Sequence, residues 1–248
     1  MPECAFCPHD GKLSAEHITS EWMSQLFPGK LSVWYTKGRG KKTRWQSDTM
    51  DWKARVVCET CNNTWMSDIE AKHAKPVLTP LITGGLDIPI RLAEARSMAL
   101  FAFKTAVVLD HANRRPESHF FERSLRHSFR ENLSIPANVQ MWLGGFVGHR
   151  GNGHFTTLYH QGQLSATDSF LMYVCTFALG NLAIQVVAVK DKANDAIIRS
   201  DPRFKVLAVP FWPGLRPDFV WPARDALRSN SDFDAFANRW ETIEVIPL

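Results

Sequence analysis

The sequence lacks a long hydrophobic stretch, and its amino terminus carries no cationic segment followed by an apolar one. The longest apolar run extends from Phe170 to Leu179, which is far too short to cross a bilayer as a helix. These absences argue against a secretory signal and against a membrane span. We therefore expect a cytoplasmic protein that has no membrane partner.

Internal repeats and low-complexity tracts are missing as well, and charged residues make up only 22% of the 248 residues. Hydrophobic residues make up 45%, which is enough to build a core and excludes the disordered and fibrous classes. The formal net charge of +4 permits a polyanionic partner without requiring one. Six Lys and Arg residues and no acid occur in residues 30–45, so the rest of the chain carries a net −2.

Cysteine is scarce, yet four of the five cysteines form two Cys-x-x-Cys pairs, which are Cys4 with Cys7 and Cys58 with Cys61. Two such pairs suit a single tetrahedral Zn²⁺ of structural function, because each pair spans two corners of the tetrahedron. His9 could replace one thiolate as a ligand. Cys175 lies within the longest apolar run, where a buried free thiol is the usual state.

Hydrophobic periodicity predicts several helices. The first should extend from about residue 62 to residue 74 and end at Pro76 and Pro80. A Thr-Gly-Gly turn at 83–85 then marks a boundary between residues 1–83 and residues 84–248. Three further helices are expected over residues 92–111, 117–130 and 232–240, the last capped by Ser231 or Asp232.

The second unit also contains a series of expected strands. Branched and aromatic residues bounded by turn formers predict strands over 139–147, 155–159, 170–179, 182–189 and 204–211. The dipeptide Gly180-Asn181 between two of them is a tight hairpin signal. The predicted fold class is α+β, in which the second unit has a mainly antiparallel sheet and covering helices.

An acid-histidine dipeptide, Glu16-His17, lies between the two cysteine pairs, and Asn62 directly follows the last cysteine. This arrangement resembles the zinc-stapled HNH endonucleases of the ββα-metal, endonuclease VII-like kind, over roughly residues 4–70. The resemblance implies an amino-terminal ββα-metal nuclease module. It implies an enzyme that hydrolyses phosphodiester bonds of nucleic acid, with double-stranded DNA as the expected substrate.

The resemblance also implies roles for individual residues. His17 would be the general base that deprotonates the attacking water, because imidazole titrates near neutral pH. Glu16 and Asn62 would hold a catalytic Mg²⁺ or Mn²⁺ through oxygen ligands. Asn63 could take the place of Asn62 if the helix starts one residue later.

Two supporting residues are less closely matched. The family's middle Asn is missing from residues 51–57, so either Asp51 substitutes for it or the role is absent. Glu70 would support the site or position DNA from the helix that carries Asn62. The remaining histidines, among them His111 and His119, are interpreted as surface or structural residues.

The basic segment of residues 33–45 combines aromatic residues with five cations, which are Lys37, Arg39, Lys41, Lys42 and Arg44. One interpretation is a solvated loop. The other is a set of phosphate contacts on a duplex flanking the cut.

Residues 84–248 are expected to select the substrate, to mediate self-association as a homo-oligomer or to bind a regulatory protein. A different class of function also fits the first third of the chain. In that alternative, the zinc module has no catalytic activity and binds nucleic acid or a protein partner.

Overall fold

The computed structural model describes residues 3–8, 12–26, 31–37, 41–112, 119–147, 153–163, 169–190, 197–199, 207–214, 219–222, 225–240 and 244–246. For residues 31–37, 41–45, 163, 197–199 and 244–246, the backbone alone is described. No helix in these ranges is long and apolar enough to cross a membrane.

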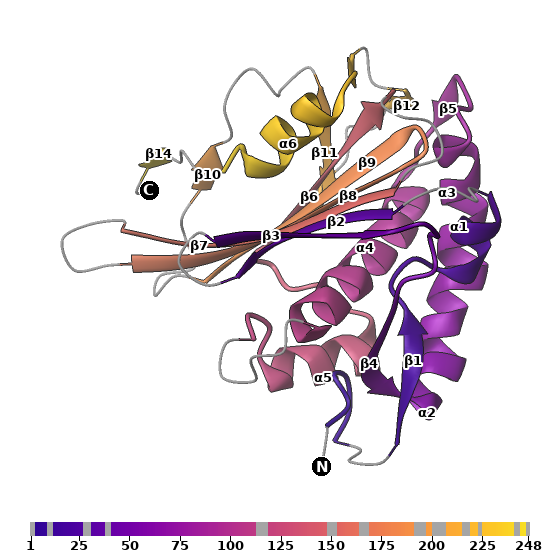
Figure 1. Ribbon diagram of the computed structural model, residues 1–248, viewed down its shortest axis with the longest axis vertical. Coiled ribbons are helices and arrows are strands. Elements are labelled where there is room, and N and C mark those ends of the chain that lie inside the picture. The colour runs from indigo at the N-terminus through magenta and orange to yellow at the C-terminus, as the bar shows by residue number, and fades with distance from the viewer. Residues whose placement is uncertain are drawn as a thin grey trace.

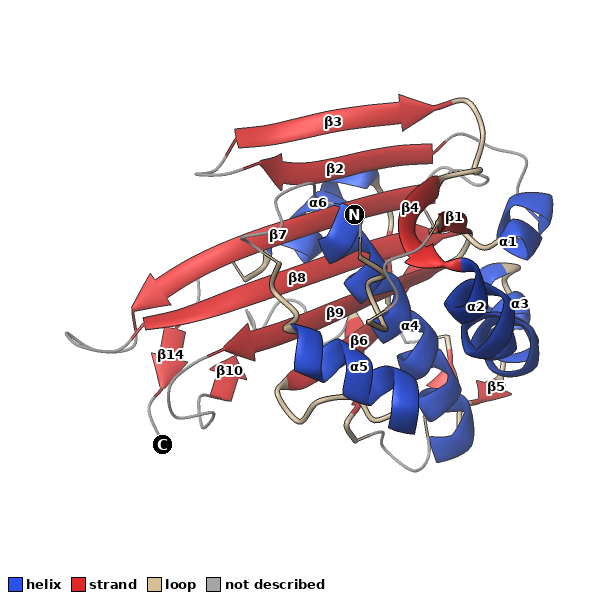
Figure 2. Cartoon of the chain, turned by 90° about the horizontal axis from the view of Figure 1, so that it is seen from below, coloured by secondary structure: helices blue, strands red, loops and turns tan. Residues whose placement is uncertain are grey.

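A curled, mainly antiparallel sheet forms the centre of the protein (Figures 1 and 2). Its strands, in spatial order, are β11 (Ala208–Trp212), β6 (Val139–Phe146), β9 (Leu182–Lys190), β8 (Ser169–Leu179), β7 (Gly153–Gln163), β2 (Leu31–Lys37) and β3 (Lys41–Ser47). The short strand β13 (Ala226–Leu227) pairs with β6. Only the β2–β7 and β13–β6 pairs are parallel among the strand pairs that the structure describes. The predicted α+β class and antiparallel sheet are therefore confirmed.

Helices cover both faces of this sheet (Figure 2). The long helix α4 (Leu92–Ala112) and α5 (Arg123–Asn132) lie on one face, and α6 (Asn230–Asn238) lies on the other. Helix α4 is apolar on most of its circumference and is buried without interruption from Met98 to Asp110. On the opposite face, Phe233 and Phe236 of α6 pack with Trp240 in a second apolar cluster.

The amino-terminal third builds a smaller structure beside α4. Strands β1 (Leu13–His17) and β4 (Lys53–Cys58) form a separate antiparallel pair. A helical segment follows β4 at once and comprises α2 (Glu59–Cys61), η1 (Asn62–Met66), η2 (Ile69–Ala74) and α3 (Lys75–Ile82). The two η elements are wound as π-helix, and the backbone of Thr64 departs from helical geometry (φ −112°, ψ −105°).

The smaller elements complete the chain. They are α1 (Glu21–Leu26), the pair β5 (Ile88–Pro89) and β12 (Val220–Trp221), and the pair β10 (Ile197–Arg199) and β14 (Glu244–Ile246).

Several predictions for the second unit are confirmed. Strands β6, β7, β8, β9 and β11 overlap the five predicted ranges, and Gly180 takes a positive φ of 55° in the predicted hairpin turn. Helix α5 begins at Arg123, six residues later than predicted, because Glu122 is extended and serves as its N-cap. The predicted cap of α6 is wrong. Ser229 is the cap, and its side chain accepts a hydrogen bond from the backbone N–H of Asp232.

Two predictions for the first third are wrong. Pro76 and Pro80 do not end the helix, which continues to Ile82. Pro76 lies in the first turn of α3, where the missing N–H costs little. The basic segment is not a loop, because β2 and β3 form an antiparallel hairpin whose first strand pairs with β7. The central sheet therefore crosses the predicted boundary between residues 83 and 84, as does the main hydrophobic core.

Candidate metal centre and acid-histidine site

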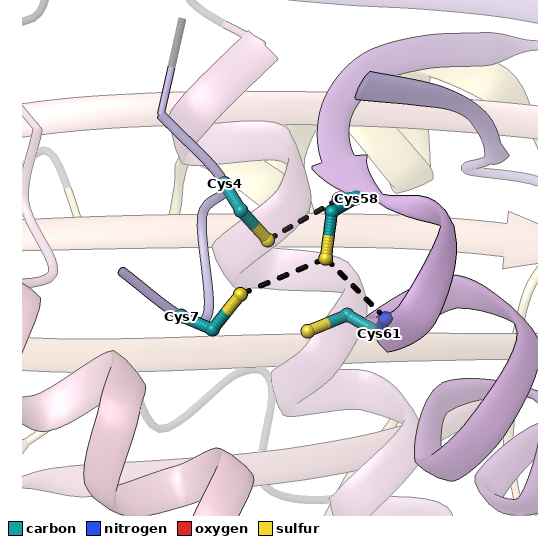
Figure 3. Close-up of side chains that lie close together, drawn as sticks. All are labelled: Cys4, Cys7, Cys58 and Cys61. Atoms are coloured by element: carbon teal, nitrogen blue, oxygen red, sulfur yellow. Dashed lines mark hydrogen bonds between the residues drawn. The ribbon is translucent and has the colours of Figure 1, made fainter. Parts of the chain in front are cut away.

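The four paired cysteines converge at the base of the amino-terminal third (Figure 3). Their sulfur atoms all lie within 4.8 Å of one another, and all four residues are buried. A tetrahedral zinc with Zn–S bonds of about 2.3 Å needs sulfur atoms roughly 3.8 Å apart. The sulfurs of Cys7 and Cys58 are 3.6 Å apart, and the cysteines are not bonded as disulfides. The cluster could therefore hold a metal ion such as zinc.

Backbone N–H groups donate hydrogen bonds to two of the sulfur atoms in this cluster. The backbone N–H of Cys58 donates to the Cys4 sulfur (3.3 Å), and that of Cys61 donates to the Cys58 sulfur (3.5 Å). A hydrogen bond from the Cys61 thiol lowers the pKa of Cys4 to about 4, and the same bond raises the pKa of Cys61. Negative charge is thus favoured at the Cys4 sulfur, and metal binding requires a thiolate ligand.

Aromatic packing anchors the first cysteine pair to the rest of the protein. Phe6 lies edge-on to Trp65 with ring centroids 5.0 Å apart, and both rings contact Phe129 of α5. The guanidinium of Arg126 donates to the carbonyl of Ala5 and to that of Phe121. The cysteine cluster therefore belongs to the main core.

His17 is the last residue of β1 and lies at the surface, with 29% of its side chain exposed. Its Nε2 atom is 3.3 Å from Oδ1 of Asp51. The other carboxylate oxygen of Asp51 is 3.1 Å from Nζ of Lys53. The structure therefore places the proposed base beside Asp51, the residue that could substitute for the family's middle Asn.

Glu16 lies one position earlier in β1 and is buried. Its Oε1 atom accepts a hydrogen bond of 2.8 Å from Nζ of Lys104, a residue of α4. The same ammonium donates to Oε1 of Glu70 in η2. Burial alone would lower the pKa of Lys104, but the attraction of both carboxylates outweighs burial and raises that pKa above its usual value. Glu16 is thus part of a charged triad in which Glu16 and Lys104 are buried and Glu70 is partly buried.

Asn62 lies beside the same strand. Its Nδ2 atom donates to the hydroxyl of Ser14 (3.1 Å), two residues before Glu16 in β1. Asn63 is exposed, and the side chain that reaches β1 is that of Asn62. The geometry therefore brings Asn62, Glu16 and Glu70 to the interface between β1 and the helical segment.

Sequence reasoning missed Lys104, although a signal was present. Lys104 is the only charged residue between Ser97 and Leu109, in the middle of a helix that was predicted to be buried. A lysine is almost never fully buried unless it is paired. An acidic partner could have been expected for it, but its identity could not, because Glu16 is 88 residues away in the chain.

The residues predicted to bind nucleic acid lie on the β2–β3 hairpin. Lys37 ends β2, and Lys41, Lys42 and Arg44 lie in β3, which is the last strand at that end of the sheet as described. Arg39 lies outside the described residues. The hairpin register places Lys37 opposite Lys41. The backbone thus gathers these basic positions along one edge of the sheet.

Comparisons with protein-family models, with curated proteins and with solved structures found no match to this chain. What the site can do therefore has to be argued from its own geometry. That geometry comprises a buried four-cysteine cluster, a partly exposed histidine beside an aspartate, and the side chains of Glu16 and Asn62 on an adjoining strand and helix.

A separate group of titratable side chains lies at the carboxyl end of α4. The rings of His111 and His119 are 3.8 Å apart, and the Asp110 carboxylate accepts hydrogen bonds from the backbone N–H groups of Phe120 and Phe121. Burial, together with the charge of Arg126, lowers the pKa of His111 to about 3. The fold therefore keeps His111 neutral where the unfolded chain would protonate it.

This neutral histidine predicts a loss of stability in acid. Below pH 6.5 the unfolded state binds a proton at His111, whereas the folded state binds it only near pH 3, so stability falls as the pH falls through that window. The slope from one such group is at most about 1.4 kcal/mol per pH unit. In urea unfolding measured between pH 7 and pH 4, His111→Gln should show a flatter decline than the parent. Equal slopes in the variant and the parent would contradict the prediction.

Proposed function

We propose that this chain is a zinc-stapled HNH endonuclease that hydrolyses phosphodiester bonds of nucleic acid, with double-stranded DNA as its substrate. One observation carries the proposal. An antiparallel strand pair leads directly into a helical segment at the cysteine cluster, and Glu16, His17 and Asn62 lie on those elements. The proposed base and the proposed ion ligands are thereby carried by the strand and the helical segment that start at the cysteine cluster.

In this proposal His17 acts as the general base. The carboxylate of Asp51 beside Nε2 favours the tautomer that has its proton on that nitrogen, which leaves Nδ1 free to accept a proton from water. Asp51 also fixes the plane of the ring. The surface position of His17 gives the attacking water and the substrate access to the base.

The oxygen ligands suit a hard divalent ion. Because Nδ2 of Asn62 is used by Ser14, Oδ1 of the amide remains available as a ligand. Glu16 supplies a carboxylate from the neighbouring strand. A bound Mg²⁺ or Mn²⁺ would stabilise the negative charge that develops on the scissile phosphate.

The zinc ion would take no part in the hydrolysis of the phosphodiester bond. It would join the turn at Cys4 to the junction of β4 and α2, and so fix the start of the helical segment that carries Asn62. A site with four protein ligands is typical of a structural zinc, because a catalytic zinc keeps one position open.

Contacts between the β2–β3 hairpin and the phosphates of the duplex would position the duplex on the protein. The edge position of β3 leaves one side of that strand unpaired within the described sheet, so a duplex could lie along this edge. The hairpin comes from residues 1–83 and pairs with β7 of residues 84–248, so we assign to the second unit a part in substrate selection, as the support of this hairpin, in preference to self-association or regulation.

The hairpin assignment makes a prediction about salt. Replacing Lys41, Lys42 and Arg44 by Ala should weaken binding to all duplex sequences about equally, because phosphate contacts carry no sequence information. It should also flatten the plot of log affinity against log salt by roughly 0.9 for each phosphate that the variant no longer neutralises. Fluorescence anisotropy over a range of salt concentrations would measure both effects. An unchanged slope would move the DNA-binding surface to another part of the protein.

One specific observation favours the non-catalytic alternative. The ammonium of Lys104 already compensates the charge of Glu16, which a purely structural zinc module would also permit. Incubation of zinc-loaded protein with supercoiled plasmid and Mg²⁺ or Mn²⁺ separates the two functions. A nuclease nicks the plasmid, whereas a binding module shifts it intact. A module that binds only a protein does neither.

A further inference from the structure

The buried contact among Lys104, Glu16 and Glu70 has no role in the mechanism above. The Lys104 side chain is 1% exposed, the Glu16 side chain 4% and the Glu70 side chain 19%. The three groups come from α4, β1 and η2, so the contact joins elements that are distant in the chain. Burial of two charged groups and part of a third is costly unless their charges compensate one another.

The geometry points to Lys104 as a positioning residue of the proposed active site. Its ammonium holds the Glu16 carboxylate in one orientation and ties it to Glu70, so that Glu16 presents its second oxygen to the ion. This inference rests on the proposed function and extends it to a residue of the second unit.

The hydrogen bonds support this role. Within the described part of the chain, Lys104 engages only the Oε1 atom of each glutamate, which leaves both Oε2 atoms available. A glutamate side chain has three rotatable bonds, and an unanchored carboxylate would sample several directions. Hydrogen bonds that orient metal ligands typically change metal affinity by about 10- to 100-fold.

The position of Lys104 on α4 makes it a rigid support. Helix α4 contacts η2 and β4 on one side, and β9 and β11 on the other. The ammonium also lies 5.6 Å from the centre of the Phe101 ring. Because the helix is buried around Lys104, the side chain has no route to solvent. The central helix therefore fixes the separation between β1 and the helical segment.

Mn²⁺ affinity of the zinc-loaded full chain tests this role without DNA cleavage. Lys104→Met combined with Glu70→Gln removes one positive and one negative charge, so the net charge of the triad stays at −1. Coulombic attraction for the ion is therefore retained while the orienting hydrogen bonds are removed. Titration followed by the electron paramagnetic resonance of free Mn²⁺ should show binding about 10- to 100-fold weaker than in the parent.

A second comparison applies if the double variant does not fold. Glu70→Gln and Asp68→Asn each remove one negative charge from the helical segment, but only Glu70 contacts Lys104, whereas Asp68 pairs with Lys72 at the surface. Glu70→Gln should weaken Mn²⁺ binding by about tenfold or more, and Asp68→Asn should leave it within a factor of about two.

Arg239→Met is the control for a loss of stability that does not involve the triad. Arg239 is a second buried cation, on the opposite face of the sheet, where its Nε donates to Gln185 at 2.8 Å. Arg239→Met should lower the melting temperature while Mn²⁺ affinity and zinc content stay at the parental values.

The outcomes are distinct. Unchanged Mn²⁺ affinity in the double variant, or in Glu70→Gln, would overturn the positioning role. Tighter binding would overturn it too, since it would show that the ammonium competes with the ion. A parent that binds zinc but no Mn²⁺ would overturn the proposed function itself, and this inference with it.

Discussion

Cys58→Ser should lose the metal ion and unfold the amino-terminal third of the chain. A structural zinc contributes on the order of 10 to 16 kcal/mol to the folding of small modules, which equals the whole net stability of an ordinary domain. Here the cluster joins residues 4–7 to residues 58–61 and supports the packing of Phe6 against Trp65. Elemental analysis should find one zinc per parent chain and none in the variant, and limited proteolysis should then cut within residues 1–75.

Cys175→Ser provides the matched control. Cys175 is a buried free cysteine of β8 outside the cluster, so its replacement should leave the zinc content at one per chain. Natively purified, active protein without zinc would show that the cluster has no structural metal.

His17→Ala should reduce the rate of DNA cleavage by at least about a hundredfold, the usual contribution of a general base. The variant should keep its zinc and its stability, because the partly exposed His17 side chain contacts Asp51 and not the cysteine cluster. Single-turnover cleavage of a labelled duplex at saturating protein would measure the chemical step separately from binding.

His73→Ala is the control for this experiment, since His73 is an exposed histidine of η2 that has no role in the proposed mechanism. It should cleave at the parental rate. Parental rates in His17→Ala would mean that the base has been misassigned, even if the protein is a nuclease.

Features of the sequence that depend on near neighbours were predictable. The two Cys-x-x-Cys pairs define a metal site by their spacing, and the four cysteines do converge. Strands β8 and β9 follow each other through a two-residue turn, so their pairing could be inferred from a short stretch of chain. The long helix α4 was recognisable from its apolar length.

Features that depend on distant partners were not predictable. The β2–β3 hairpin carries so many cations that its sequence resembles a solvated loop, and its place in the sheet depends on pairing with β7, far along the chain. The same holds for Lys104, whose partners lie on β1 and η2.

The parallel pairing of β2 with β7 has a consequence for synthesis on the ribosome. Leu31 pairs with Gly153, so β2 cannot join the sheet until residue 153 has been synthesised. At roughly 5 to 20 residues per second, that wait lasts on the order of ten seconds. During this time both edges of the hairpin are open to other nascent chains, and lysines on an edge strand discourage such pairing. The basic residues to which we assign phosphate binding would thus also protect the nascent chain from aggregation before the sheet is complete.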